Sequence, residues 1–201
     1  MVSGKKNVSK YLSYLLRHAP ESIGLEMDNH GWVSVDQLID RLNAGGKYEI
    51  SLKDIRNIVA NDAKGRFRLD EGFKRIKACQ GHTIAWVEPE LTIAAPPRFL
   101  YHGTIVKALE KIEACGFISR MQRHAVHMQA ELEPAWASAV RWHAKPVVLK
   151  IDSARMYGDG FSFGISDNGV WCTEQVPAEY IAGRIYDLRG DSADGQTEEI
   201  K

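Results

Sequence analysis

The sequence predicts an α+β protein of two lobes, from its length and from a change of pattern along the chain. With 201 residues, zero formal net charge and 44% hydrophobic residues, it can bury a core as one large domain or two small ones. Residues 1–90 show helical periodicity followed by a hairpin pattern, whereas residues 99–189 mix short strands with two helices. Prolines mark residues 91–98 as a connector, and the polar residues 190–201 are predicted to be a disordered tail.

The first lobe is predicted to contain three helices and a hairpin. Ser34 and Ser51 each precede an apolar repeat, and Gln37 and Asp54 follow three residues after them, which is the spacing of a capping box. Three helices followed by a hairpin is the order of a winged helix, a frequent nucleic-acid-binding module. The helices are expected after Asn7, Ser34 and Ser51, the first ending at His18, and the strands at residues 64–69 and 73–79.

The second lobe is predicted to be a strand-rich α+β core. Alternation along a strand entered at Arg123 would place Arg123 and His127 on one face and His124 on the other. Gly103, at a strand-to-helix junction, would let a ligand approach the backbone closely. The strands are expected at residues 99–101, 125–128, 147–151 and 170–173, and the helices at residues 105–115 and 134–143.

Basic residues concentrate in the predicted hairpin, although the whole chain is neutral. Only Asp70 and Glu71 oppose them within that segment. This asymmetry indicates an anionic partner met at one face, or else a solvated hairpin surface. The basic residues are Lys64, Arg66, Arg68, Lys74, Arg75 and Lys77.

Several classes of protein are excluded by what the sequence lacks. There is no membrane-spanning run or signal core, and three cysteines lie far apart, so we expect a cytoplasmic protein with reduced thiols and no membrane partner. No metal is expected, because His124 and His127 belong to no ligand motif, and no Walker or dinucleotide motif occurs. Ser162 matches Gly-x-Ser-x-Gly, but the last histidine, His143, precedes it, which is not the hydrolase order.

Arginine and histidine recur in the remaining polar clusters, without paired carboxylates. Arg17 and His18 close the first helix, where the helix dipole favours any cation. Arginine also presents a planar fork that matches phosphate oxygens. A site of this composition would bind and stabilise anionic phosphoryl groups. Further clusters lie at residues 80–82, 101–104, 123–127 and 168–171.

Taken in order, these clusters resemble those of the tRNA 2′-phosphotransferase family, a branch of the ADP-ribosyltransferases. The resemblance implies a winged-helix RNA lobe followed by an NAD-binding, ADP-ribosyltransferase-like lobe. It also implies that NAD+ and a tRNA-like RNA carrying a 2′-phosphate are the substrates, with no obligatory protein partner. The matching stretches are residues 9–20, 31–33, 78–82, 99–104, 123–128 and 168–171.

The family's reaction, as the resemblance implies it, removes an internal 2′-phosphate from RNA in two steps. The phosphate first attacks the NAD+ ribose carbon that bears nicotinamide, which gives ADP-ribosylated RNA and free nicotinamide. The ribose 2″-hydroxyl then attacks the phosphorus, which releases RNA 2′-OH and ADP-ribose 1″,2″-cyclic phosphate. Arg17 and Arg123 would hold the phosphate, and His18 would act as hydrogen-bond donor or general acid–base group.

The resemblance also assigns the binding residues and reveals one departure. The family's remaining essential arginine is expected three residues before Gln80, where this chain has Lys77, so Lys77 completes the predicted catalytic set. Lysine lacks the bidentate fork. We therefore expect Arg75 to lend a guanidinium and the second step to be slow. NAD+ would contact His102, Gly103, Thr104, His127, Asn168, Gly169 and Val170, and RNA would contact Arg75, Gln80 and His82.

Two alternatives stay open. An ADP-ribosyltransferase that stops after the first step would cap terminal phosphates of RNA or DNA, and Lys77 mildly favours it. A non-catalytic winged-helix protein would only bind nucleic acid and would carry a degenerate second lobe. The joint presence of five arginines and histidines argues against this last class: Arg17, His18, His102, Arg123 and His127.

Overall fold

The computed structural model describes residues 2–188, and the predicted tail at 190–201 lies outside the described residues. These residues contain six α-helices and several small sheets, which confirms the mixed α and β class. They form two compact units. Unit 1 comprises residues 2–94, Arg120–Val126 and Ser162–Glu174; unit 2 comprises Ala95–Ser119, His127–Phe161 and residues 175–188. Two late segments thus belong to unit 1, whereas the sequence predicted lobes that are continuous along the chain.

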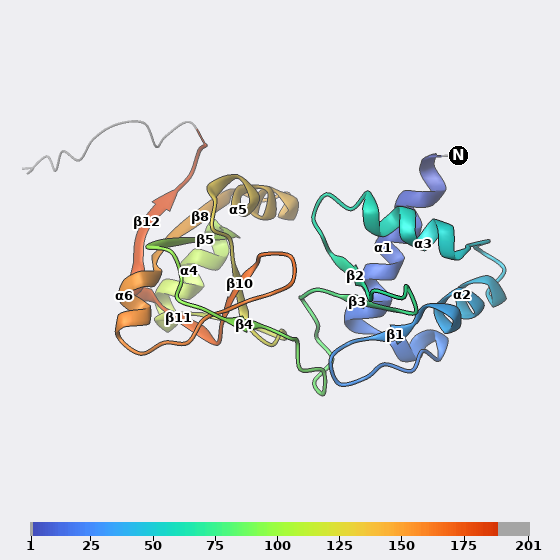
Figure 1. The fold of residues 1–201 in the computed structure, drawn as a ribbon. Helices are drawn as coiled ribbons and strands as arrows, with labels where there is room; N and C mark the ends of the chain where they lie inside the picture. The colour runs from blue at the N-terminus through green and yellow to red at the C-terminus, as the bar shows by residue number, and fades with distance from the viewer. Residues whose placement is uncertain (1, 189–201) are drawn as a thin grey trace, which may run out of the picture. The chain divides into compact units, whose positions relative to one another are not determined.

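The helices of unit 1 are α1 (Val2–His18), α2 (Val35–Ala44) and α3 (Leu52–Ala60) (Figure 1). The Ser34 hydroxyl accepts the Gln37 N–H, and Ser51 forms a reciprocal capping box with Asp54. Both predicted starts are therefore confirmed. The predicted N-cap at Asn7 is wrong, because α1 begins earlier: the polar residues before the apolar repeat are also compatible with a helix.

The core of unit 1 forms between one face of α1 and a three-stranded sheet. Leu12, Leu15 and Leu16 are fully buried on that face. The antiparallel sheet has the order β1-β3-β2 and comprises β1 (Val33–Ser34), β2 (Phe67–Leu69) and β3 (Arg75–Ala78). The hairpin β2–β3 was predicted, but β1 was not, since two residues carry no readable period. The 3-10 turn η1 (Pro20–Ile23) ends α1, as its proline predicts.

A second set of strands explains why distant segments join unit 1. It comprises β4 (Thr92–Ile93), β9 (Gly164–Ile165) and β10 (Trp171–Thr173). Thr92 pairs with Ile165, and Ile165 pairs with Trp171. The segment expected to be a connector therefore contains a strand, whose partners lie about seventy residues later in the chain.

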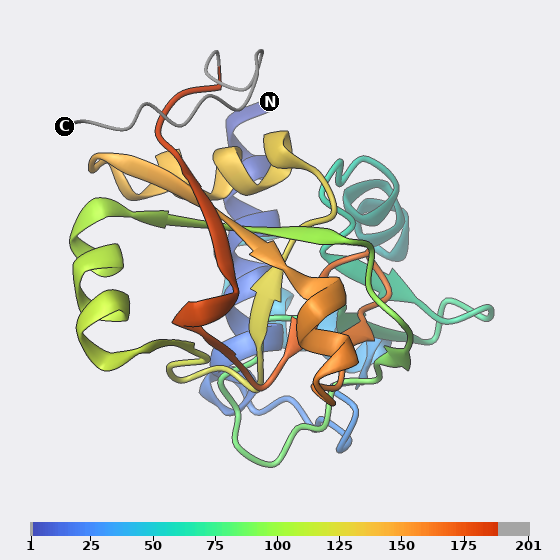
Figure 2. The ribbon, with the colours of Figure 1, turned by 90° about the vertical axis from the view of Figure 1, so that its left-hand side faces the viewer.

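Unit 2 is built on an antiparallel sheet of order β12-β8-β5 (Figure 2), and β11 pairs with β6 in a smaller one. Helix α5 packs against β5 and β8. The strands are β5 (Phe99–Ile105), β6 (Phe117–Ser119), β8 (Pro146–Asp152), β11 (Gln175–Pro177) and β12 (Ile181–Ile185), with β7 (Val126–Met128) entering the unit at His127. The helices are α4 (Val106–Cys115), α5 (Leu132–Ala139) and α6 (Ser153–Gly158), with 3-10 turns η2 (Val140–Trp142) and η3 (Ala178–Tyr180).

Two local expectations in the second half of the chain are wrong. Strand β5 continues through Ile105, so Gly103 lies inside a strand, and a Cβ there would stand 1.9 Å from the carbonyl oxygen of Ala135 in α5. This glycine is required for helix-on-sheet packing. Residues 123–125 precede β7, so strand alternation does not govern Arg123 and His124.

We expect Gly103→Ala to destabilise unit 2 strongly, because its methyl group would overlap the backbone of α5. Overpacking of this kind costs about 1–3 kcal/mol or more in the free energy of unfolding. Gly183→Ala in β12 is the matched control, since its Cβ would make only an ordinary contact at 3.7 Å with Lys150. Urea denaturation of both variants tests this, and equal stabilities would contradict it.

Candidate active site

The C-terminal end of α1 is covered by the loop that carries Gln80, Gly81 and His82. The Thr83 N–H donates to the Arg17 carbonyl at 2.9 Å, which satisfies one of the carbonyls left open at a helix end. Gly81 has φ +90°, and a Cβ there would lie 3.6 Å from Cζ of Arg17. The glycine thus lets the loop backbone rest on the guanidinium.

Arg17 is the centre of positive charge in this region. Its Nε and Nη2 atoms are buried and have no hydrogen-bond partner. Burial, followed by the charges of Arg66 and Arg123, lowers the pKa of Arg17 to about 10, so the group is still cationic at neutral pH. A buried cation with unpaired N–H donors is poised to receive an anion.

Arg66 was predicted only as part of the basic hairpin and not as a site residue, yet its charge acts on Arg17. Its Nε donates to Asp62 Oδ1 at 3.0 Å, and its Nη2 lies 2.9 Å from the same oxygen and 3.1 Å from Ser9 Oγ. The Asp62 side chain is only 4% exposed. Burial alone would raise the pKa of Asp62, but its hydrogen bonds with Arg66 outweigh this and lower it. A signal was present, because Arg66 and Arg68 flank the buried Phe67 and must both point away from the core.

Arg123 lies in a turn of unit 1, and the neighbouring His124 fixes the position of this turn. The Arg123 N–H donates to the Arg120 carbonyl at 3.0 Å, and His124 Nε2 donates to the Ile84 carbonyl at 2.9 Å. The second bond ties this turn to the loop that covers Arg17. Burial, Arg17 and Arg123 together lower the pKa of His18. The structure therefore brings Arg17, His18 and Arg123 into one electrostatic cluster.

Two histidines line this cluster in different ways. His18 is exposed, and its Nδ1 is hydrogen-bonded to Thr83 Oγ1 at 2.9 Å. His82 is 1% exposed, neither of its ring nitrogens has a partner, and its Nε2 would lie 2.9 Å from a Cβ at Gly31. Burial, and after it the charge of Arg17, lowers the pKa of His82 to about 4. Both histidines are therefore neutral at pH 7.

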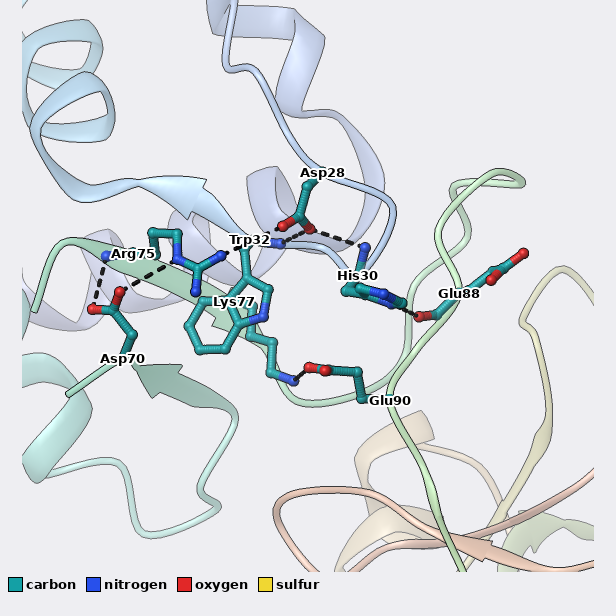
Figure 3. Close-up of polar contacts among 8 residues, drawn as sticks. All are labelled: Asp28, His30, Trp32, Asp70, Arg75, Lys77, Glu88 and Glu90. Atoms are coloured by element: carbon teal, nitrogen blue, oxygen red, sulfur yellow. Dashed lines mark hydrogen bonds and ion pairs between the residues drawn. The ribbon is translucent and has the colours of Figure 1, made fainter. Parts of the chain in front are cut away.

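Lys77 and Arg75 form ion pairs with carboxylates of unit 1 (Figure 3). Lys77 Nζ lies 2.6 Å from Glu90 Oε2 and 2.7 Å from Asp167 Oδ2, with its side chain 3% exposed. Burial opposes the charge, but the bonds to both carboxylates outweigh it and raise the pKa of Lys77. Lys77 and Arg75 approach the Trp32 ring at 4.9 and 5.1 Å. Lys77 is therefore enclosed by carboxylates and does not present its charge as a phosphate clamp would.

The basic patch of the hairpin is largely neutralised by acids, some of them local and others from distant parts of the chain. Arg75 lies 3.3 Å from Asp70 and 3.8 Å from Asp28, and Arg68 lies 2.6 Å from Asp167. With Arg66 on Asp62 and Lys77 on two carboxylates, four of the six basic residues have ion-pair partners. Counting charges within the segment overlooked partners that only folding brings near.

The residues assigned to NAD+ fall into both units. In unit 2, His102 Nδ1 donates to the His127 carbonyl at 2.9 Å, which orients the imidazole on the partly exposed strand β5, beside Gly103 and Thr104. In unit 1, Asn168 donates to the Lys64 carbonyl at 3.0 Å and accepts from Ser166 Oγ at 2.8 Å. The turn that carries Asn168, Gly169 and Val170 is thereby attached to the hairpin.

Unit 1 also has an open hollow of about 330 Å³ that the sequence did not indicate. Leu91, Phe163 and Ala125 give it apolar walls, and Arg120 and Glu174 supply charge. Its lining, among the described residues, contains none of the residues assigned to NAD+.

Three more observations bear on the expected environment of the protein. Cys79, Cys115 and Cys172 are free thiols. In residues 2–188, no helix is long and apolar enough to cross a membrane, and no group of three or more His, Cys, Asp or Glu side chains is placed to hold a metal ion. The cytoplasmic location and the absence of a metal stay predictions.

The arginines and histidines around Arg17, whose buried Nε and Nη2 have no hydrogen-bond partner, form an arrangement suited to an anionic group such as a phosphate. The chain matches the family model described as RNA 2′-phosphotransferase, Tpt1 / KptA family, over residues 3–175. It is 46% identical over 175 residues to a probable RNA 2′-phosphotransferase of Rhizobium leguminosarum bv. trifolii (strain WSM2304), covering 87% of this chain and 92% of the relative. Probable RNA 2′-phosphotransferases of Streptomyces coelicolor and Burkholderia pseudomallei are 45% and 42% identical, covering 87% and 86% of this chain and 92% of each relative. The chain therefore belongs to the RNA 2′-phosphotransferase family, a family of transferases.

We expect the buried, neutral His82 to make stability depend on pH. Its pKa is about 4 in the folded protein against an ordinary 6.5, so between these values the unfolded chain binds a proton that the folded protein does not. The free energy of unfolding should therefore fall as the pH is lowered through this window, by on the order of 3 kcal/mol at pH 4. Urea titrations from pH 7 to 4 should show a shallower decline for His82→Gln, and equal slopes would contradict this.

Proposed function

We propose that this protein transfers an internal 2′-phosphate from RNA to NAD+, releasing RNA 2′-OH, ADP-ribose 1″,2″-cyclic phosphate and nicotinamide. The observation that carries this proposal is the buried guanidinium of Arg17, whose Nε and Nη2 have no partner beside two further arginines. A buried cation whose pKa is lowered by two neighbouring arginines is stabilised by an anion, and a phosphate dianion supplies one. The resemblance and the family membership point to the same substrate.

The phosphate would be bound by Arg17, Arg66 and Arg123. Asp62 accepts from Nε of Arg66 and pairs with its Nη2, so the guanidinium is already oriented before a phosphate binds. Groups oriented in advance stabilise charge that develops on the transferring phosphoryl group without reorganisation. His18 is neutral and anchored at Nδ1 by Thr83, so its Nε2 would exchange a proton with the phosphate or with the attacking hydroxyl.

NAD+ would be held by polar groups of unit 2, on β5 and at His127. The fit is chemical: His102 donates through Nδ1 to the His127 carbonyl, which orients its imidazole on β5, and imidazole and hydroxyl groups form hydrogen bonds with ribose hydroxyls. His102, Thr104 and His127 are partly exposed, and the resemblance also assigns NAD+ contacts to Asn168, Gly169 and Val170 of unit 1. When bound, NAD+ supplies the nicotinamide-bearing ribose carbon as electrophile and a ribose hydroxyl as the final phosphate acceptor.

The helices α1–α3 with the sheet β1-β3-β2 support a winged-helix assignment for unit 1, with β2–β3 as its wing. Lys64 and Lys74 are the wing cations with no ion pair among the described contacts. They, rather than the whole basic patch, would contact the RNA backbone. Such a module suits a tRNA-like substrate in the cytoplasm, as the sequence predicted.

The function is tested with purified protein, NAD+ and an RNA oligonucleotide that carries one internal 2′-phosphate. We expect conversion to the 2′-OH form with stoichiometric release of nicotinamide, and neither product when NAD+ is omitted. An RNA with only a 5′-phosphate is the control for a capping activity. Absence of both dephosphorylation and nicotinamide release under saturating NAD+ would overturn the proposal.

We expect Arg66, and not Lys77, to be the third cation of the phosphate site. Arg66→Lys should lower kcat/KM by roughly 100-fold, as loss of one oriented donor does, while Arg56→Lys, an exposed arginine of α3, should have little effect. Lys77→Met should instead lower the free energy of unfolding by about 1–3 kcal/mol, because it removes hydrogen bonds to two carboxylates.

Activity and urea denaturation of each folded variant separate these roles. A Lys77→Arg variant that turns over faster than the wild type would restore Lys77 as the catalytic position that the sequence predicted.

A further inference from the structure

An aromatic stripe runs along α1 to His18. We define it as Tyr48, Tyr11, Tyr14 and His18. The ring centroids of Tyr48 and Tyr11 are 5.8 Å apart, those of Tyr11 and Tyr14 6.4 Å, and those of Tyr14 and His18 6.1 Å. Residues 11, 14 and 18 follow the i, i+3, i+7 spacing of one helix face.

This stripe is separate from the face of α1 that forms the core. Leu12, Leu15 and Leu16 fill the core and are fully buried, and Tyr11 and Tyr48 pack against its edge. Tyr14 is 50% exposed. A half-exposed aromatic ring that the core does not use offers a flat apolar surface to a ligand.

Its surroundings select the kind of ligand. Lys10 is exposed one helical turn before Tyr14, and Lys47 Nζ lies 5.4 Å from the Tyr48 ring centroid. The stripe ends at His18, next to Arg17 in the cluster that would bind the 2′-phosphate. Aromatic faces interleaved with cations are typical of surfaces on which the bases of single-stranded nucleic acids stack.

We propose that Tyr14 is the platform on which a base next to the 2′-phosphate stacks, with the aromatic stripe guiding the single-stranded RNA to His18. This rests on the proposed function, since the RNA must place its phosphate at Arg17. A base is separated from its own 2′-phosphate by a single ribose ring, so Tyr14, in ring contact with His18, lies within reach of that nucleotide or of its neighbour. Stacking accepts every base, so the stripe would secure the substrate without reading its sequence.

The test measures binding of a short 2′-phosphorylated RNA by fluorescence anisotropy without NAD+. Tyr14→Leu keeps apolar bulk and helix propensity but removes the ring, and should weaken binding roughly 5- to 150-fold, the usual range for one base stack. Tyr14→Phe keeps the ring and should bind like the wild type. Tyr157→Leu, at an equally exposed tyrosine of α6, is the matched control and should change nothing.

Three further RNAs carry an abasic residue at the phosphorylated nucleotide or at its 5′ or 3′ neighbour. On one of them the wild type and Tyr14→Leu should bind equally, because the base that stacks is gone. An unchanged affinity of Tyr14→Leu for the intact RNA, or an equal loss on all three abasic RNAs, would overturn the stacking role. A wild type that binds the RNA but transfers no phosphate would overturn the proposed function alone.

Discussion

The burial of the Arg17 guanidinium is the constraint on which the proposed phosphate site depends. Burying an unpaired cation costs free energy, and the positive charges of two neighbouring arginines increase this cost. Arg17 is kept in place because the apolar face of α1 anchors the helix in the core and because Gly81 lets the covering loop rest on the side chain. An anion that enters would compensate this charge, which is why we propose the phosphate site at Arg17.

A second network decides how the chain is divided between the two units. Asp167 bonds to Lys77 and Arg68, and Asn168 bonds to the Lys64 carbonyl, so a turn some ninety residues beyond the hairpin is attached to it. Lys77 therefore has a structural explanation: a compact ammonium fits between two carboxylates and under the Trp32 ring. A positive charge thus stabilises the fold at Lys77, where two carboxylates pair with it, and stays without a hydrogen-bond partner at Nε and Nη2 of Arg17, where we propose that the substrate binds.

Local signals in the sequence correctly predicted where several elements of the fold begin. The capping pairs at Ser34 and Ser51 located α2 and α3, since such caps involve only residues three apart. Features that depend on distant partners were missed or misjudged. Strand β1 is too short to show a period, and Gly103 was interpreted as a ligand contact although α5 packs on it. Arg66 was named only within the basic hairpin, because its effect on the charge of Arg17 arises from folding.

The sequence by itself determined the mixed class, the principal helices and the order of arginine and histidine clusters that identifies the family. These are properties of residue type and spacing, which folding does not alter. Only the tertiary structure decided which cations are free to act. Ion pairing and burial depend on contacts between residues far apart in the chain, and such contacts enclosed Lys77 and Arg75, oriented Arg66 and left Arg17 buried without a partner.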